Sequence, residues 1–354
     1  MSRFFSYKYK NMIPYVPGEQ PQDKKYIKLN TNESPYPPSE KAIEAAGRAA
    51  ESLMLYPDPD CSKLNNALAN MLDVDADEIL VTNGSDEILN FAFMAFCDKN
   101  TPAVFPDITY GFYSVFADLN GVPYKTIPLK DDFTIDISNY YNADGTIFIA
   151  NPNAPTGIAL KAGDIEKIVK NNPDNVVVID EAYVDFGGES AVELIHKYDN
   201  LLVTQTFSKS RSMAGARLGF GVGCKSLISD INTLKFSTNP YNINKMTMAA
   251  GIGVLEDEEY TKSNCEKTVS ARAYAAGELK KLGFDITNSA ANFIFAKHPK
   301  VSGEKIYKSL KEKGILVRHF DTDRIKDYNR ITVGTMEQMK ILIEKTKEIL
   351  EAVL

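Results

Sequence analysis

The sequence is poor in residues that bind metals or form disulfides. Its four cysteines form no CxxC pair, and its three histidines are not paired at the spacing of metal ligands. We therefore predict neither a metal site nor a disulfide framework, and unpaired thiols of this kind are typical of a reducing cytoplasm. The cysteines are Cys61, Cys97, Cys224 and Cys265, and the histidines are His196, His298 and His319.

Long apolar runs and basic clusters are also missing. No stretch approaches the roughly 18 apolar residues of a membrane-spanning helix, and residues 1–20 lack an apolar segment of signal-peptide length. Because 40 Lys and Arg face 47 Asp and Glu, the formal net charge is −7, and no Lys/Arg-rich run is present. These features argue against a membrane protein and against a non-specific nucleic-acid binder.

The residues that are present are ordinary for a globular enzyme. The chain has 354 residues, of which 44% are apolar and 25% charged, enough for one large or two ordinary domains. Helix-length segments such as residues 159–170 and 191–198 separate several short apolar runs. This alternation predicts βα units and an α/β fold with a largely parallel sheet. The predicted strands are residues 78–81, 103–105, 146–150, 176–179 and 201–205.

Beyond Gly223 the pattern changes to one typical of a smaller α+β domain. We predict helices at 225–234, 302–313 and 336–354, and a long helical stretch at 244–280 that breaks near Asp257. Strands are expected at 292–296, 315–318 and 329–333. Prolines and a glycine make residues 1–33 an irregular arm. The predicted domains are therefore this arm, a large domain at 34–245 and a small domain at 246–354.

The segment that ends the last strand of the large domain carries the clearest chemical signal. A buried run at residues 201–205 leads into Thr206, Ser208, Lys209 and then Arg217. A lysine in such a loop can form a Schiff base with a carbonyl compound, and hydroxyl and guanidinium groups hold phosphate monoesters. Together these residues indicate pyridoxal phosphate, whose aldehyde needs an amine and whose phosphate needs hydrogen-bond donors.

Other polar residues follow the remaining strands. Gly84, Ser85 and Asp86 open a helix whose first amides suit a phosphate, and Asp180 ends a central strand where a pyridinium nitrogen would balance its charge. In a parallel sheet such residues gather at the carboxyl edge, so we expect them to converge with Tyr110, Asn153 and Tyr183 on one crevice.

Each of these features also has a simpler explanation when taken alone. Ser85, Asp86 or Asp180 could be a helix N-cap, and Tyr56 could be a partly exposed turn residue beside prolines. The GFGVG segment at residues 219–223 lacks GxGxxG spacing and a following acidic residue, so we interpret it as a packed strand and not as a dinucleotide site. The hypothesis rests on the residues occurring together.

The motifs that carry these residues resemble the fold-type I, aspartate-aminotransferase-like pyridoxal-phosphate enzymes. Within them the chain is most similar to the histidinol-phosphate aminotransferase family, and the similarity covers nearly the whole length. The matching segments are LNTNESPYPPS, LYPDPD, NGSDEI, NPNAPTG, VIDEAYVDF, TFSKSRSMAGARLGFGVG, ANFIF and NRITVG. The resemblance implies a large domain with a mixed, mostly parallel sheet flanked by helices, and a smaller α+β domain.

The resemblance also implies roles for the residues around the cofactor ring. Lys209 would form the Schiff base and shuttle a proton, while Asp180 would keep the pyridine nitrogen protonated so that the ring withdraws electrons. Asn153 and Tyr183 would hydrogen-bond the phenolate oxygen, and Tyr110 would stack on the ring.

Further residues are implied for the phosphate and the substrate. The phosphate would contact the helix start at Gly84, Ser85 and Asp86, together with Thr206, Ser208 and Arg217. Tyr56 would reach it from the other subunit, which implies a homodimer with shared active sites. Arg330 and a second arginine, Arg318, would receive the anionic end of the substrate. Asn32 and Glu33 would lie near the substrate, and Tyr15 in the arm is a further contact.

The implied reaction is a ping-pong amino transfer from histidinol phosphate to 2-oxoglutarate, giving imidazole acetol phosphate and glutamate. The same machinery would serve an aromatic amino-acid aminotransferase or a threonine-phosphate decarboxylase of cobalamin synthesis. The two arginines suit either phosphorylated substrate. A pyridoxal-phosphate-binding regulator is a further alternative, but the chain has no spare length for a DNA-binding domain.

Overall fold

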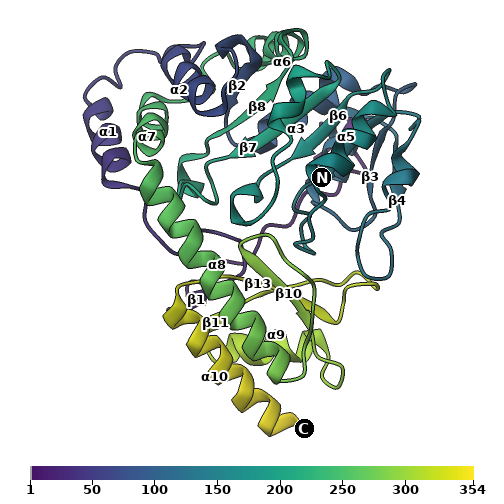
Figure 1. Ribbon diagram of the computed structural model, residues 1–354, viewed down its shortest axis with the longest axis vertical. Coiled ribbons are helices and arrows are strands. Elements are labelled where there is room, and N and C mark those ends of the chain that lie inside the picture. The colour runs from purple at the N-terminus through teal and green to yellow at the C-terminus, as the bar shows by residue number, and fades with distance from the viewer. Residues whose placement is uncertain (1) are drawn as a thin grey trace.

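The computed structural model describes residues 2–354, and its largest element is a seven-stranded sheet (Figure 1). The strands follow the order β2-β8-β7-β6-β5-β3-β4. β8 is antiparallel to both neighbours and the other pairs are parallel, which confirms the predicted sheet type. The strands are β2 (Ile79–Thr82), β3 (Ala103–Pro106), β4 (Tyr124–Ile127), β5 (Thr146–Ala150), β6 (Val177–Asp180), β7 (Leu201–Thr206) and β8 (Gly219–Gly223).

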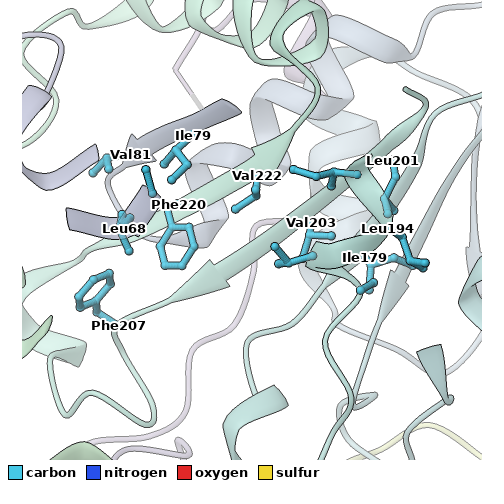
Figure 2. Packing of buried hydrophobic residues seen from close by; sticks show 14 of the residues in the cluster. Leu68, Ile79, Val81, Ile179, Leu194, Leu201, Val203, Phe207, Phe220 and Val222 are labelled. Carbon is cyan, nitrogen blue, oxygen red and sulfur yellow. The ribbon is translucent and has the colours of Figure 1, made fainter. Parts of the chain in front are cut away.

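Except at the exposed edge strand β4, both faces of this sheet are buried, as expected for a parallel sheet with near-continuous apolar strands. Successive residues point to opposite faces, so Val177 and Ile179 of β6 pack on one side while Val178 packs on the other. Figure 2 shows side chains of the first face spread over four neighbouring strands. They are Ile79 and Val81 on β2, Phe220 and Val222 on β8, Leu201 and Val203 on β7, and Ile179 on β6.

Helices cover each face. One face packs on α2, α5 and α7, and the other on α3, α4 and α6. The segment 191–198, expected to be of helix length, forms only a short 3-10 helix, η5 (Val192–His196). Within the described part of the chain, every helix is too short or too polar to span a bilayer. The bounds are α1 (Glu40–Ala50), α2 (Ser62–Leu72), α3 (Ser85–Phe96), α4 (Phe112–Asn120), α5 (Ala162–Lys170), α6 (Lys225–Thr238) and α7 (Lys245–Leu255), with 3-10 helices η1 (Tyr7–Tyr9), η2 (Ala76–Glu78), η3 (Ile137–Tyr140), η4 (Val184–Phe186) and η6 (Ala214–Ala216).

The C-terminal part builds a second, smaller sheet with its own core, drawn in yellow-green in Figure 1. Its strand order is β12-β13-β10-β9, and every pair is antiparallel, as is typical of the α+β type predicted for this part of the chain. Helices begin where caps satisfy their first amides: Ser302 caps α9, and Thr335 with Gln338 forms a capping box on α10. The elements are α8 (Glu258–Lys281), β9 (Asp285–Ile286), β10 (Phe293–Lys297), α9 (Gly303–Glu312), β11 (Ile315–Leu316), β12 (Arg318–His319), β13 (Tyr328–Thr332) and α10 (Met336–Val353).

Two segments connect the sheets. The predicted break near Asp257 is confirmed: α7 ends at Leu255 and packs on α1 and α2, whereas α8 begins at Glu258 and packs on α10. The N-terminal arm returns to the small sheet, where β1 (Ile27–Lys28) pairs in parallel with β11. The domain boundaries at residues 33 and 245 stay a proposal.

A close backbone contact fixes the start of α3 against the large sheet. A Cβ built on Gly219 would lie 2.3 Å from the Ser85 nitrogen, so only glycine lets β8 approach the first turn of α3 this closely. The carboxyl end of β2 and the N-terminus of α3 are thereby held beside the carboxyl ends of β7 and β6. This edge of the sheet is where the predicted site residues should gather.

Candidate active site

A cavity of about 590 Å³ opens at the carboxyl edge of the large sheet, between that sheet and the small one. It collects most of the residues that the sequence singled out. A second cavity, of about 600 Å³ and located between η4 and α8, has none of them in its wall. The predicted residues that line the first cavity are Tyr15, Asn32, Glu33, Ser85, Asp86, Tyr110, Asp180, Tyr183, Thr206, Ser208, Lys209, Arg217, Arg318 and Arg330.

Lys209 lies in the loop after β7, and its amine points into the cavity among charged and aromatic residues. The amine donates to the Thr31 carbonyl at 3.3 Å and lies 5.8 Å from the centre of the Tyr183 ring. Burial and the nearby Arg330 guanidinium lower the pKa of Lys209 to about 8. A lysine with a lowered pKa is partly neutral near physiological pH, and a neutral amine is the form that attacks a carbonyl.

Asp180 ends β6 and is buried, with 4% of its surface exposed. Its carboxylate accepts hydrogen bonds from the Ala182 amide at 3.2 Å and the Tyr113 hydroxyl at 3.3 Å, and both donors are uncharged. Burial, and then the nearby Asp86 carboxylate, raises the pKa of Asp180 to about 7. A buried carboxylate held only by neutral donors is costly unless a cation joins it, and a protonated pyridine nitrogen is such a cation.

A hydrogen-bonded chain orients Tyr183. Its hydroxyl accepts from the Asn32 side-chain amide at 3.0 Å, which leaves the hydroxyl hydrogen available for another acceptor. The Asn32 side-chain oxygen in turn accepts from Thr332 at 3.0 Å, and the Asn32 carbonyl accepts from Asn292 at 2.9 Å. Asn32 therefore lines the cavity, and its amide orients the Tyr183 hydroxyl. Asn32 is itself held by Thr332 of β13 and by Asn292.

The start of α3 forms the anion-binding end of the cavity. The first amides of a helix have no partner within it, and the helix dipole favours a negative charge there. The Arg217 guanidinium lies against Gly84, where a Cβ would come within 2.7 Å of it, and donates to Asp86 at 3.0 Å. Thr206 and Ser208 contribute two hydroxyls 3.0 Å apart. Amides, hydroxyls and a guanidinium in one place suit a phosphate monoester.

At the opposite end, two arginines lie directly across from each other on neighbouring strands. Arg318 of β12 and Arg330 of β13 are register partners, and both line the cavity. Like charges directly opposite in a sheet are destabilising, so an anion between them would relieve the repulsion. The Arg330 side chain donates to the Asn30 carbonyl at 3.2 Å, but its buried Nε has no hydrogen-bond partner among residues 2–354.

The arm covers part of the cavity mouth. The Tyr15 ring stacks on Phe112 with centroids 4.1 Å apart, and Arg318 donates to the Val16 carbonyl at 3.3 Å. Glu33 accepts from Thr31 and forms an ion pair with Lys28. Although burial acts in the other direction, these contacts lower the pKa of Glu33, so it adds a negative charge to the wall.

Three predicted residues lie off the wall of this cavity. Tyr56 is 80% exposed and stacks on Tyr241, with centroids 4.7 Å apart. Asn153 is buried, donates to the Ile108 carbonyl and Thr156, and accepts from Thr109. The Gly84 amide donates to the Thr82 carbonyl at 2.9 Å, within the turn that precedes α3. The roles expected for Tyr56 and Asn153 therefore stay predictions: Tyr56 would need a second chain, and the Asn153 side chain bonds to other protein groups.

Some site residues were not predicted. Tyr113 contacts Asp180, the Thr31 carbonyl accepts from Lys209, and Phe112 stacks on Tyr15. Tyr113 follows Tyr110 by three residues, and this spacing just before and within α4 could have indicated that the two rings lie together. The contact of the Thr31 carbonyl could not have been predicted, because every residue has a backbone carbonyl and the residue type says nothing about where it points.

The whole chain matches known proteins. Residues 24–345 match the model of the family described as aminotransferase class I and II. A histidinol-phosphate aminotransferase of Marinomonas sp. is 53% identical over 98% of the chain and 99% of its own length. A histidinol-phosphate aminotransferase of Brachyspira hyodysenteriae is 50% identical over 99% of this chain and 100% of its own length.

Two solved structures share the fold. That of histidinol-phosphate aminotransferase from Sinorhizobium meliloti, in complex with pyridoxal-5'-phosphate, gives a TM-score of 0.85 at 23% identity, over 94% of this chain and 92% of that one. The structure of the histidinol-phosphate aminotransferase from Clostridium acetobutylicum gives a TM-score of 0.85 at 24% identity, over 93% of this chain and 100% of that one. Both likenesses confirm the fold type predicted from the sequence.

The lowered pKa of Lys209 gives a direct prediction for the cofactor-free protein. Labelling by an amine-reactive reagent, followed by mass spectrometry of the Lys209 peptide, should reach half its maximal rate near pH 8, because the amine becomes neutral above its pKa. A lysine in a short peptide would do so near about pH 10.4. Lys209→Arg should remove the signal and thus assign it. Half-maximal labelling near pH 10 would contradict the environment described for this amine.

Proposed function

Since the chain belongs to the aminotransferase class I and II family, we propose that it transfers the amino group of histidinol phosphate to 2-oxoglutarate. The products are imidazole acetol phosphate and glutamate, and the reaction belongs to histidine biosynthesis. The observation that carries the proposal is one cavity that holds Lys209 and Asp180 together with the paired arginines Arg318 and Arg330. Relatives of about half-identical sequence over the full length support the choice of substrate.

The enzymes of this family depend on pyridoxal phosphate, and the residues of the cavity fit it. Asp180 offers a buried carboxylate without a charged partner in its hydrogen bonds, and the start of α3 offers amides beside the Arg217 guanidinium. When bound, pyridoxal phosphate supplies an aldehyde and a protonated ring that withdraws electrons from the carbon bearing the amino group. Asp180 would hold the ring nitrogen, and Tyr183 would donate to the ring oxygen.

Lys209 has two tasks in this cavity. Its neutral amine would hold the cofactor through the aldehyde, and when the donor's amine takes that place, the free Lys209 amine would be the group that accepts a proton from the donor's Cα. The lowered pKa suits both tasks, because a proton acceptor works best when its pKa lies near the working pH. Tyr183 and Asp180 stay in place during both half-reactions because β6, Asn32 and Ala182 fix them.

The arginine pair selects the substrate by charge. A phosphate ester carries up to two negative charges and several acceptor oxygens, which match two guanidinium groups better than one carboxylate does. Among residues 2–354 the Arg330 Nε has no hydrogen-bond partner, and Arg318 donates to the Pro17 and Val16 carbonyls of the arm. In the second half-reaction the same arginines receive a carboxylate of 2-oxoglutarate, so one anion site serves both substrates.

The proposal includes a homodimer in which Tyr56 completes the partner's phosphate site. Leu53, Met54, Leu55 and Tyr56 form a run that is more than half exposed in a single chain. Tyr241 stacks on Tyr56 and extends this surface. An apolar surface of this kind supports burial against a second copy. We also propose that the enzyme works in the cytoplasm, where its four free cysteines would stay reduced.

The substrate proposal is tested by three compounds assayed side by side. With 2-oxoglutarate as acceptor, histidinol phosphate should give glutamate with a kcat/KM at least about a hundredfold above that for phenylalanine, because loss of a phosphate contact to two arginines costs about 3 kcal/mol. Threonine phosphate should release no CO2. Phenylalanine as the better donor would contradict the assigned role of Arg318, and CO2 release without transfer would identify a decarboxylase.

Lys209→Ala is the control: it should lose turnover but still bind pyridoxal phosphate, and residual transamination would refute the role of Lys209.

The dimer is tested by Met54→Asp. Met54 is 80% exposed in one chain, so a charge there should leave the fold of the monomer intact, with a change within about 0.5 kcal/mol. If the surface is buried between two copies, sedimentation equilibrium should show a shift from dimer to monomer and pyridoxal phosphate should bind at least about tenfold more weakly. Val353→Asp, at an exposed position near the end of α10, is the matched control and should change neither property. A wild-type monomer with full affinity would contradict the proposal.

A further inference from the structure

Asp180 is held from the side of α4 by a residue outside the cavity wall. Tyr113 has no exposed surface, and its hydroxyl donates to the Asp180 Oδ2 at 3.3 Å, while the Ala182 amide donates to Oδ1 at 3.2 Å. The two oxygens of one carboxylate are thus held by donors from two different elements. The carboxylate cannot rotate without losing one of these bonds.

The Tyr113 ring is itself fixed by apolar packing. It meets Tyr110 edge to face with centroids 5.8 Å apart, and it contacts Phe105 at 5.7 Å and Phe148 at 5.9 Å. A buried tyrosine hydroxyl needs a hydrogen-bond partner, and in this aromatic setting the partner is the carboxylate. Tyr113 is therefore a rigid donor aimed at the atom pair that would meet the cofactor's ring nitrogen.

We propose that Tyr113 is a positioning residue for the cofactor: its hydroxyl holds the Asp180 carboxylate in one orientation and favours its ionised form. The proposal rests on the proposed function, because only a bound pyridine ring makes the orientation and charge of Asp180 matter. Tyr113 does not line the cavity, so it would not touch a substrate or cofactor bound there. It acts through Asp180.

The expected consequence is a dependence on pH. The pKa of Asp180 in the cofactor-free protein is already about 7, raised by burial and Asp86 and lowered by the Ala182 amide, Tyr113 and Lys209. Removal of the Tyr113 hydroxyl takes away a bond that favours the ionised form, so the pKa of Asp180 should rise further. Below that pKa, Asp180 must lose a proton before it can pair with the ring nitrogen, and the affinity for the cofactor falls.

The sign of the effect distinguishes a positioning role from simple damage to the fold. Well above pH 7, Asp180 is ionised both in wild type and in Tyr113→Phe, so their affinities should nearly agree. Below pH 7, Asp180 is protonated in both cofactor-free proteins, and the variant lacks the bond that favours the ionised form in the complex. The ratio of the two dissociation constants should therefore grow as the pH falls.

The test is a titration of Tyr113→Phe and wild-type protein with pyridoxal phosphate, followed by visible absorbance between pH 6 and pH 9. We expect the dissociation constant of the variant to exceed that of wild type by less than about threefold at pH 9 and by about tenfold at pH 6, a tenfold ratio being the effect of one pKa unit. Tyr140→Phe is the matched control. Tyr140 is equally buried, but its hydroxyl has no hydrogen-bond partner among the described residues, so that variant should follow wild type at every pH.

Two results would overturn the role of Tyr113. One is a constant ratio across the pH range, and the other is the same widening ratio for Tyr140→Phe. In either case, wild type would still bind pyridoxal phosphate and transaminate, so the proposed function would stand. Wild-type protein that binds no pyridoxal phosphate at any pH would instead refute the proposed function, and with it the role of Tyr113.

Discussion

The structure depends on one electrostatic arrangement: a buried carboxylate and a partly buried amine share a cavity without forming an ion pair with each other. Asp180 is held by two neutral donors and Lys209 donates to a backbone carbonyl. Burial disfavours both charges and moves the two pKa values toward neutrality, to about 7 and about 8. A protein gains nothing in stability from this arrangement, and it becomes useful only when a ligand brings a cation to Asp180 and a carbonyl to Lys209.

The rest of the fold keeps these two groups apart and aimed at the same space. β6 and β7 are adjacent and parallel, so their carboxyl ends present Asp180 and the Lys209 loop at one edge of the sheet. The close contact between Gly219 and Ser85 adds the amide end of α3, and β12 and β13 add the arginines from the other side. The cavity is therefore a product of two sheets, and the small sheet supplies the part that recognises an anionic substrate.

Much of this could be predicted from the sequence, for a physical reason. A strand buried on both faces is a short apolar run, and the polar residue that follows marks where the strand leaves the core, as at Asp180 after β6. Strands that face solvent give no such signal. β4 was therefore missed, because Tyr124 and Lys125 are exposed, and the arm's pairing with β11 was missed because two residues carry too little pattern.

Contacts between elements could not be predicted, because they depend on register and on side-chain direction. The sequence named Arg318 and Arg330 but could not place them opposite each other on β12 and β13. It placed Asn32 near the substrate, and the structure has Asn32 in the cavity wall, but the bond from its amide to Tyr183 could not be predicted. The link from Tyr113 to Asp180 spans 67 residues and depends on how α4 packs on the sheet.

The most direct test of the account is chemical trapping of the amine that meets the cofactor's aldehyde. Pyridoxal phosphate is added to the wild-type protein, the bond is reduced with borohydride, and the modified peptide is identified by mass spectrometry. The account predicts one equivalent of label per chain, on Lys209, and a loss of that label when Asp180 is replaced by Ala at a subsaturating cofactor concentration. Label on another lysine, or equal labelling of Lys209 with and without Asp180, would contradict the claim that this amine and this carboxylate form one site.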